Sequence, residues 1–146
     1  MKKEGFTLAE VLITIAIVGV VAAITIPIVS VDINKRANMT KAKSVATDLE
    51  IAYGNALIDD DEENIADTKL ATLTDTDGFE ALQKYMVVTK DKDENNKDVI
   101  KTKNGACIFQ NNSEITIDAN CTDKPNKVGV DKFKYTRNSN GTLSEK

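Results

Sequence analysis

Residues 5–31 read GFTLAEVLITIAIVGVVAAITIPIVSV, and this stretch decides the fold. From Val11 to Val31 it contains 21 consecutive residues without a charge. An α-helix of about 20 apolar residues is long enough to span the hydrocarbon core of a bilayer. A secretory signal peptide has a shorter apolar region, of about 7–15 residues, which ends at a small-residue cleavage site. We therefore expect a membrane-spanning helix at the N-terminus.

One carboxylate, that of Glu10, stands immediately before the apolar run. An unpaired carboxylate in or near lipid costs a few kcal/mol or more, so an ionisable group at this place is a functional candidate by default. The alternative is that Glu10 lies at headgroup level and is simply solvated. The residues alone leave both interpretations open.

The region from Asp32 to Ile58 changes from uniformly apolar to apolar on one side only. This pattern is typical of an amphipathic helix. We expect it to continue the membrane helix as one rod of about 50 residues, roughly 75 Å long at 1.5 Å per residue. Five consecutive acids, residues 59–63, then favour an exposed loop. The expected inward side chains are Val45, Leu49, Ala52, Tyr53, Ala56 and Leu57.

The remaining residues predict a short helix followed by a small antiparallel sheet of three or four strands. We expect the helix over 77–86, with Asp77 as its cap, and a polar loop over 91–98. Turn signals lie at 111–113 and at 140–141. The expected strands are 99–103, 106–110, 114–118 and 132–136.

The two cysteines, Cys107 and Cys121, fall in and just after the first predicted hairpin. Their spacing fits an intramolecular disulfide if the domain lies outside the cytoplasm. The alternative is a pair of reduced, buried thiols in a cytosolic protein. The apolar N-terminus argues against that alternative.

The composition of the 146-residue chain bounds its function. It suits one modest domain, and it contains no histidine, so no Ser-His-Asp or Cys-His arrangement and no histidine metal site can form. No Gly-rich phosphate loop is present. We therefore expect no enzyme, no cofactor and no metal site.

Charge is unevenly distributed along the chain. Residues 59–98 hold thirteen acids and five lysines, whereas residues 99–146 hold eight basic residues and five acids. This split could produce head-to-tail attraction between subunits. The plainer interpretation is a solvated surface with chance clustering.

The hexapeptide Gly5-Phe6-Thr7-Leu8-Ala9-Glu10 follows a short basic leader with Lys2 and Lys3. Together with the uncharged run, it closely resembles the prepilin signal of type IV pilins and type II secretion pseudopilins. Gly19 and Pro27 also stand where that family commonly has Gly and Pro. The resemblance is strong over about the first 30 residues and loose beyond them.

The resemblance implies a processing and assembly pathway. A prepilin peptidase would cut between Gly5 and Phe6 and methylate the new amine of Phe6. Glu10 would pair with the terminal amine of a neighbouring subunit, which supplies the partner that a buried charge needs. The chain would be a single-pass protein of the inner membrane before it joins other pilin or pseudopilin subunits in a periplasmic or extracellular filament.

The resemblance also implies a pilin-like α+β fold, in which a long N-terminal helix packs on a small antiparallel sheet. The expected divisions are a leader (1–5), a transmembrane and filament-core helix (6–31), an amphipathic helix (32–58) and a globular domain (59–146). The signal does not separate a pilus from a secretion or competence pseudopilus. The loosely conforming C-terminal domain favours a pseudopilin or a minor pilin.

A second, weaker resemblance covers Asp118-Ala119-Asn120, Pro125-Asn126, Gly129, Asp131 and Phe133, which are similar to a segment near the C-terminus of many small prepilin-like proteins. Cys121 stands where that segment commonly has Gly. The oxygens of Asp118, Asn120, Asp123 and Asp131 would suit calcium. Turn-forming Asp and Asn side chains that bond to their own backbone are the commoner explanation.

The alternative function is a membrane-tethered binding module, for example one that captures DNA. Phe133 and Tyr135 could stack on bases beside the basic residues of the C-terminal half. If instead these aromatics are core and the lysines solvate the sheet, the surface has no stacking platform. We expect the latter and therefore no nucleic-acid binding. The basic residues are Lys101, Lys103, Lys124, Lys127, Lys132, Lys134 and Arg137.

Overall fold

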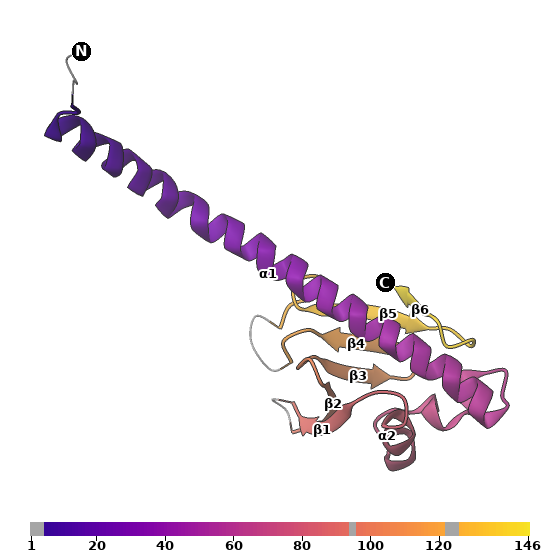
Figure 1. Ribbon diagram of the computed structural model, residues 1–146. Helices are drawn as coiled ribbons and strands as arrows, with labels where there is room; N and C mark the ends of the chain where they lie inside the picture. Colours follow the sequence, from indigo (N-terminus) through magenta and orange to yellow (C-terminus); the bar gives the residue numbers. More distant parts are fainter. Residues whose placement is uncertain (1–4, 94–95, 122–125) are drawn as a thin grey trace. The chain divides into compact units, whose positions relative to one another are not determined.

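The computed structural model describes residues 5–93, 96–121 and 126–146, with residues 27–29 described by their backbone alone. The predicted motif residues Lys2, Lys3, Asp123, Lys124 and Pro125 lie outside the described part. The chain divides into two compact units, residues 1–34 and 35–146, and each is described by itself. Helix α1, Leu8–Asp60, begins in the first unit and ends in the second (Figure 1).

In the first unit, α1 carries apolar side chains on all sides, and nearly all of those described are exposed. This helix is long and apolar enough to cross a membrane. A helix that is apolar all round requires lipid or other protein around it.

In the second unit, α1 lies over a six-stranded antiparallel sheet in which every strand pairs with its neighbour in sequence (Figure 1). In sequence, α1 is followed by two short 3-10 helices, Ile65–Asp67 and Lys69–Ala71, and by helix α2, Thr76–Leu82, before the first strand begins. The strands are β1 (Val88–Lys92), β2 (Asp98–Thr102), β3 (Cys107–Asn111), β4 (Glu114–Asp118), β5 (Lys132–Arg137) and β6 (Leu143–Glu145).

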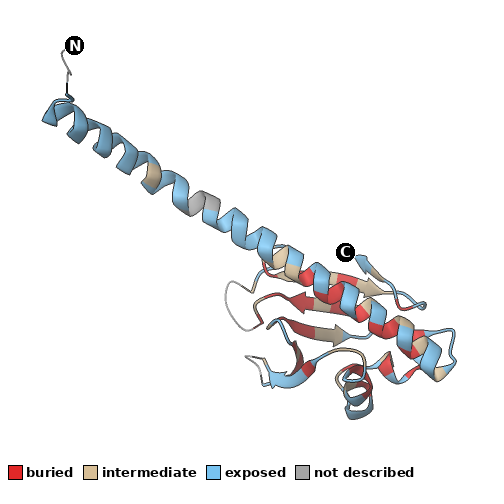
Figure 2. Cartoon of the chain, viewed as in Figure 1, coloured by how far each residue is buried: buried red, intermediate tan, exposed pale blue. Residues whose placement is uncertain are grey.

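The main core lies between α1 and one face of the sheet, and Figure 2 shows the buried stripe of α1 where it covers the strands. Of the six inward side chains predicted for this helix, five are buried and Leu57 is half-buried. The sheet contributes the alternate residues of its central strands, such as Ile115 and Ile117 of β4 opposite Tyr135 and Phe133 of β5. The α+β fold expected from the sequence is therefore confirmed.

A smaller cluster lies on the other face of the sheet. Val99, Cys107 and Cys121 are buried there, and Phe109 packs against them at the edge of the cluster. The Cys107–Cys121 disulfide joins the start of β3 to the segment that follows β4, with the two Cα atoms 4.8 Å apart. This separation lies in the usual range for a disulfide. The bond predicted from the sequence fixes that segment over the sheet.

The C-terminus closes the fold against α1. The backbone N–H of Leu143 in β6 donates to the Glu50 side chain at 2.6 Å, across 93 residues of sequence. The preceding turn, which the sequence predicted, places Gly141 directly on Tyr53. A Cβ atom on Gly141 would lie 2.7 Å from that of Tyr53, so the close approach requires glycine.

Several local predictions were wrong. The sheet has six strands rather than three or four, because β1 and β6 were not foreseen. The residues 91–98 do not form one loop: β1 continues to Lys92 and β2 begins at Asp98. As edge strands, β1 and β6 pair through their backbone and need few apolar side chains.

The short helix also differs from its prediction, since it spans Thr76–Leu82 and is capped by Asp75 instead of Asp77. The Asp75 carboxylate accepts the N–H of Gly78 at 2.7 Å, which satisfies one of the free donors of the first turn. The acidic run likewise does not lie wholly in a loop, because α1 continues through Asp60.

Candidate assembly site

The N-terminus of α1 is closed by a capping box formed by Thr7 and Glu10. The C=O of Thr7 accepts the first intrahelical bond, from Val11 N–H, so Thr7 is the N-cap. The Glu10 carboxylate accepts the N–H of Thr7 at 2.8 Å and the hydroxyl of Thr7 at 2.9 Å. Glu10 N–H lies 3.3 Å from the Thr7 hydroxyl oxygen, which completes the reciprocal pattern.

This arrangement gives Glu10 a partner that neither interpretation of the sequence contained. The exposed carboxylate has a partner within its own chain, because its own helix terminus supplies two donors. The signal was visible in the sequence as Thr-x-x-Glu before an apolar run. The pairing of Glu10 with the amine of a neighbouring subunit stays a prediction.

The predicted processing point lies just outside this cap. Gly5 and Phe6 precede the helix in extended or irregular backbone, and Phe6 is 87% exposed. Apart from its two chain neighbours, nothing in the described part of the chain lies within 4 Å of the position that a Gly5 side chain would occupy. The peptide bond between these two residues is therefore accessible from outside the chain.

Of the acidic residues that would suit calcium, Asp118 ends β4 and Asp131 directly precedes β5, whereas Asp123 lies outside the described residues. The fully buried carboxylate of Asp131 accepts the backbone N–H groups of Asn126 at 2.7 Å and Lys127 at 2.6 Å. Asp118 lies 3.5 Å from the Lys132 ammonium, and burial raises the pKa of its carboxyl despite that cation. In the described residues no three acids, cysteines or histidines gather as metal ligands. The bonds of Asp131 favour the turn-forming interpretation.

The aromatic residues that could have stacked on bases are part of the core. Phe133 and Tyr135 are both about 95% buried, on the α1 side of the sheet. The alternate residues of β5 point to the other face, where Lys134 bonds to Glu114 at 2.8 Å. The same carboxylate also accepts a hydrogen bond from the Lys146 ammonium, and the two lysines lower the pKa of Glu114 to about 2. This arrangement is typical of a solvated sheet face.

Three other basic side chains of the C-terminal half have protein partners as well. Lys132 pairs with Asp118, and Lys101 pairs with Asp91 at 3.1 Å. The Arg137 guanidinium donates to the main-chain carbonyls of Leu70 and Ala71. These three cations are therefore engaged within the chain.

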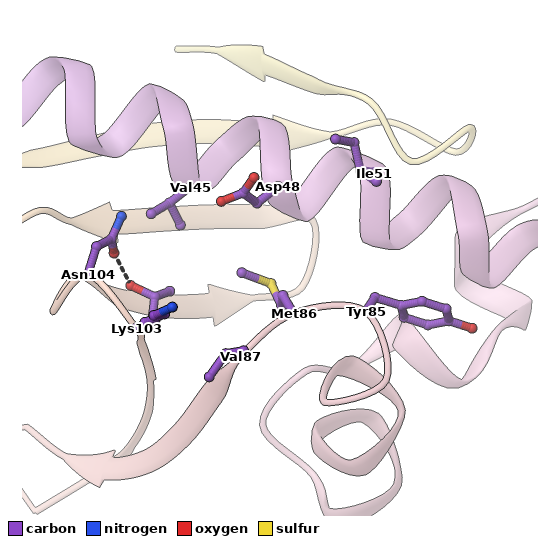
Figure 3. Close-up of a pocket in the computed structure, with 9 residues that line it drawn as sticks. Val45, Asp48, Ile51, Tyr85, Met86, Val87, Lys103 and Asn104 are labelled. Carbon is purple, nitrogen blue, oxygen red and sulfur yellow. Dashed lines mark hydrogen bonds between the residues drawn. The ribbon is translucent and has the colours of Figure 1, made fainter.

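A groove of about 540 Å³ lies beside α1 in the second unit (Figure 3). Val45, Asp48 and Ile51 of α1 form one wall, and Tyr85, Met86 and Val87 come from the connection between α2 and β1. Thr102, Lys103 and Asn104 close it at the turn between β2 and β3. No local sequence pattern could have indicated this groove, because its walls come from three separate segments.

Comparison with known protein families gives one match. Residues 1–26 match the family described as the prokaryotic N-terminal methylation motif. Neither the curated proteins nor the solved structures gave a significant match. The matched residues contain Gly5, Phe6, the capping box and most of the apolar run. The chain therefore carries the N-terminal signal of type IV pilins and pseudopilins.

Proposed function

We propose that this protein is a structural subunit of a type IV pilus or a type II secretion pseudopilus, and that its role is assembly rather than catalysis. The observation that carries the proposal is the methylation motif at residues 1–26, placed on the first turns of a helix apolar all round. An apolar helix of this kind can first hold the chain in a membrane and then be covered by the helices of neighbouring subunits.

Processing would begin with a prepilin peptidase that cuts between Gly5 and Phe6 and methylates the Phe6 amine. The exposed position of Phe6 before the cap gives the enzyme access. After assembly, the Glu10 carboxylate would pair with the amine of a neighbouring Phe6. The folded unit of residues 35–146 would form the outer surface of the filament.

The first test is mass spectrometry of the N-terminal peptide from protein made in its native host. We expect a peptide that begins at Phe6 and carries one additional methyl group. Gly5→Val is the matched control, because a bulky residue at the cleavage point should leave the leader in place. A wild-type peptide that begins at Met1, or at a position after Val31, would contradict the proposal.

The second measurement separates a filament subunit from a processed but solitary membrane protein. Cells expressing the full-length chain are sheared, and the released high-molecular-weight fraction is analysed for the protein. We expect the protein in that fraction. Correct processing without any sheared or cross-linkable polymer would refute the filament role and leave only the membrane anchor.

A further inference from the structure

The exposed large apolar side chains of the second unit concentrate in a few places. Within its described residues, those that are more than half exposed are Ile51 (57%), Ile58 (78%), Val87 (69%) and Val128 (59%). A single exposed apolar residue is ordinary. Two of these, however, line the groove of Figure 3, and a third is presented on a loop elsewhere in the same unit.

The groove has apolar walls and two charged groups. Ile51 and Val87 lie on opposite walls, with Met86 between them (Figure 3). Asp48 on α1 and Lys103 on the β2–β3 turn have no ion-pair partner in the described part of the chain. A volume of about 540 Å³ is in the range of pockets that hold a ligand or several side chains. The groove thus suits an apolar group that carries a cation on one side.

Val128 is exposed on a turn that backbone hydrogen bonds hold against the start of β5. Gly129 N–H donates to the Lys132 carbonyl at 2.8 Å, and Val128 forms a bridge with Lys132. The buried Asp131 carboxylate fixes the N–H of Lys127 on the other side of the loop. A side chain presented in this way loses little conformational freedom when it is bound. Next to it, the exposed Lys127 side chain has no ion-pair partner among the residues described.

The groove and the Val128 loop are separate surfaces of one unit. Asn38 of α1 donates to the carbonyl of Val130, so the loop lies beside residue 38 of the helix. The groove reaches Ile51, which is 13 residues, or about 20 Å, further along α1. One copy can therefore use both surfaces at the same time. A contact between two different patches is heterologous, and when it does not close on itself it produces an open helical array.

We propose that Val128 of one copy packs into the groove between Ile51 and Val87 of the next copy. Lys127 then lies beside Asp48 of that copy, and repulsion from Lys103 keeps it against the α1 wall. This inference rests on the proposed function, because it supplies the contact by which the folded units of a filament join head to tail. The partner is a second copy of this chain.

The test is site-specific cross-linking in filaments of the full-length chain. Val128→Cys and Val87→Cys are made in separately tagged copies, expressed together and oxidised after assembly. Both positions are exposed, and the native cysteines are buried and already bonded to each other. We expect a disulfide between the two tagged copies. Ile58→Cys replaces Val87→Cys in the matched control, since Ile58 is more exposed than Val87 but lies outside the groove, and it should give no cross-link.

Charge reversal examines the same contact without cysteine. Lys127→Glu and Asp48→Lys should each reduce the amount of sheared filament about fivefold, and the double variant should restore it, because coupled charges are not additive. Each residue is exposed, so neither substitution should unfold the chain. If one did, the amount of full-length chain itself would fall.

Three outcomes would overturn the proposal. The first is filaments that form normally while Val128→Cys and Val87→Cys give no disulfide. The second is a cross-link from Val87→Cys to a different protein, or from Val128→Cys only to another Val128→Cys, which would mean a different occupant or a symmetric contact. The third is the absence of any filament from wild-type chain, which would remove the proposed function together with this contact.

Discussion

The Glu10 carboxylate accepts two hydrogen bonds from Thr7, one from its backbone N–H at 2.8 Å and one from its hydroxyl at 2.9 Å. Thr7 and Glu10 together thus cap the helix that carries the methylation motif. If Glu10 also pairs with the Phe6 amine of another subunit, its cap and its charge have separate roles, and substitutions can distinguish them.

Glu10→Gln keeps an acceptor for the Thr7 donors and removes the charge, whereas Glu10→Val removes both. If the charge sets the register between subunits, both variants should insert in the membrane, and both should lower sheared filament at least about tenfold, because an unpaired amine in an apolar core costs a few kcal/mol. Thr7→Val is the control that loosens the cap and keeps the charge. Normal filament from Glu10→Gln would show that Glu10 acts through capping alone.

Acid should weaken the fold through Glu114. Its hydrogen bonds with Lys134 and Lys146 lower the carboxyl pKa from the ordinary 4.5 to about 2. A lowered pKa in the folded state stabilises the fold above pH 4.5, and this contribution is lost as the pH falls toward about 2. In urea titrations of fragment 35–146, the stability difference between wild type and Glu114→Gln should therefore shrink over that window. Lys134→Met should shift the loss to higher pH, and a constant difference would contradict this assignment.

Removal of the disulfide should destabilise the second unit. The bond closes a loop with a sequence separation of 14, which corresponds to about 3 kcal/mol in the chain-entropy estimate. Denaturant unfolding of fragment 35–146 followed by circular dichroism should show this loss in the double variant Cys107→Ala/Cys121→Ala. Reductant should lower the midpoint of the wild type and leave that of the double variant unchanged. An equal response in both would mean that the bond does not form.

Two glycines with similar backbone should respond differently to alanine. Gly141 (φ 81°) and Gly105 (φ 78°) both occupy the left-handed region, where a side chain costs about 1–2 kcal/mol. A Cβ on Gly141 would also press on Tyr53, whereas the Cβ on Gly105 would have only the Lys41 ammonium nearby, at 3.8 Å. Gly141→Ala should therefore reduce the free energy of unfolding clearly more than Gly105→Ala. Equal losses would show that Tyr53 has room to move.

The sequence predicted the elements that have their own apolar periodicity. The stripe on α1 and the alternation in β4 and β5 each report a buried face, so their positions agree with the prediction to within one or two residues. By contrast, β1 reads VTKDK and β6 only LSE. Edge strands form because a neighbour offers backbone donors and acceptors, and a pattern of side chains does not reveal that neighbour.

The candidate assembly site was predictable where its residues stand close together in the sequence. Gly5, Phe6 and Glu10 stand in one local motif, and the capping box is itself a four-residue pattern. The cap of α2 was misplaced because Asp75 and Asp77 are chemically alike, and only the three-dimensional path brings Asp75 to Gly78. The groove depends on residues from 45 to 104, and no short segment contains it.

The bond from Leu143 to Glu50 also bears on how the chain is made. Synthesis produces α1 well before β6. The apolar stripe of α1 is therefore fully buried only after the strands that pack on it have been made. A ribosomal product that stops before residue 141 lacks the turn that lies on Tyr53 and the N–H that reaches Glu50. Such a fragment keeps the apolar first half of α1 but exposes core to proteases, since unpaired and uncovered ends open first. Translation through β6 is thus a condition for survival of the folded unit.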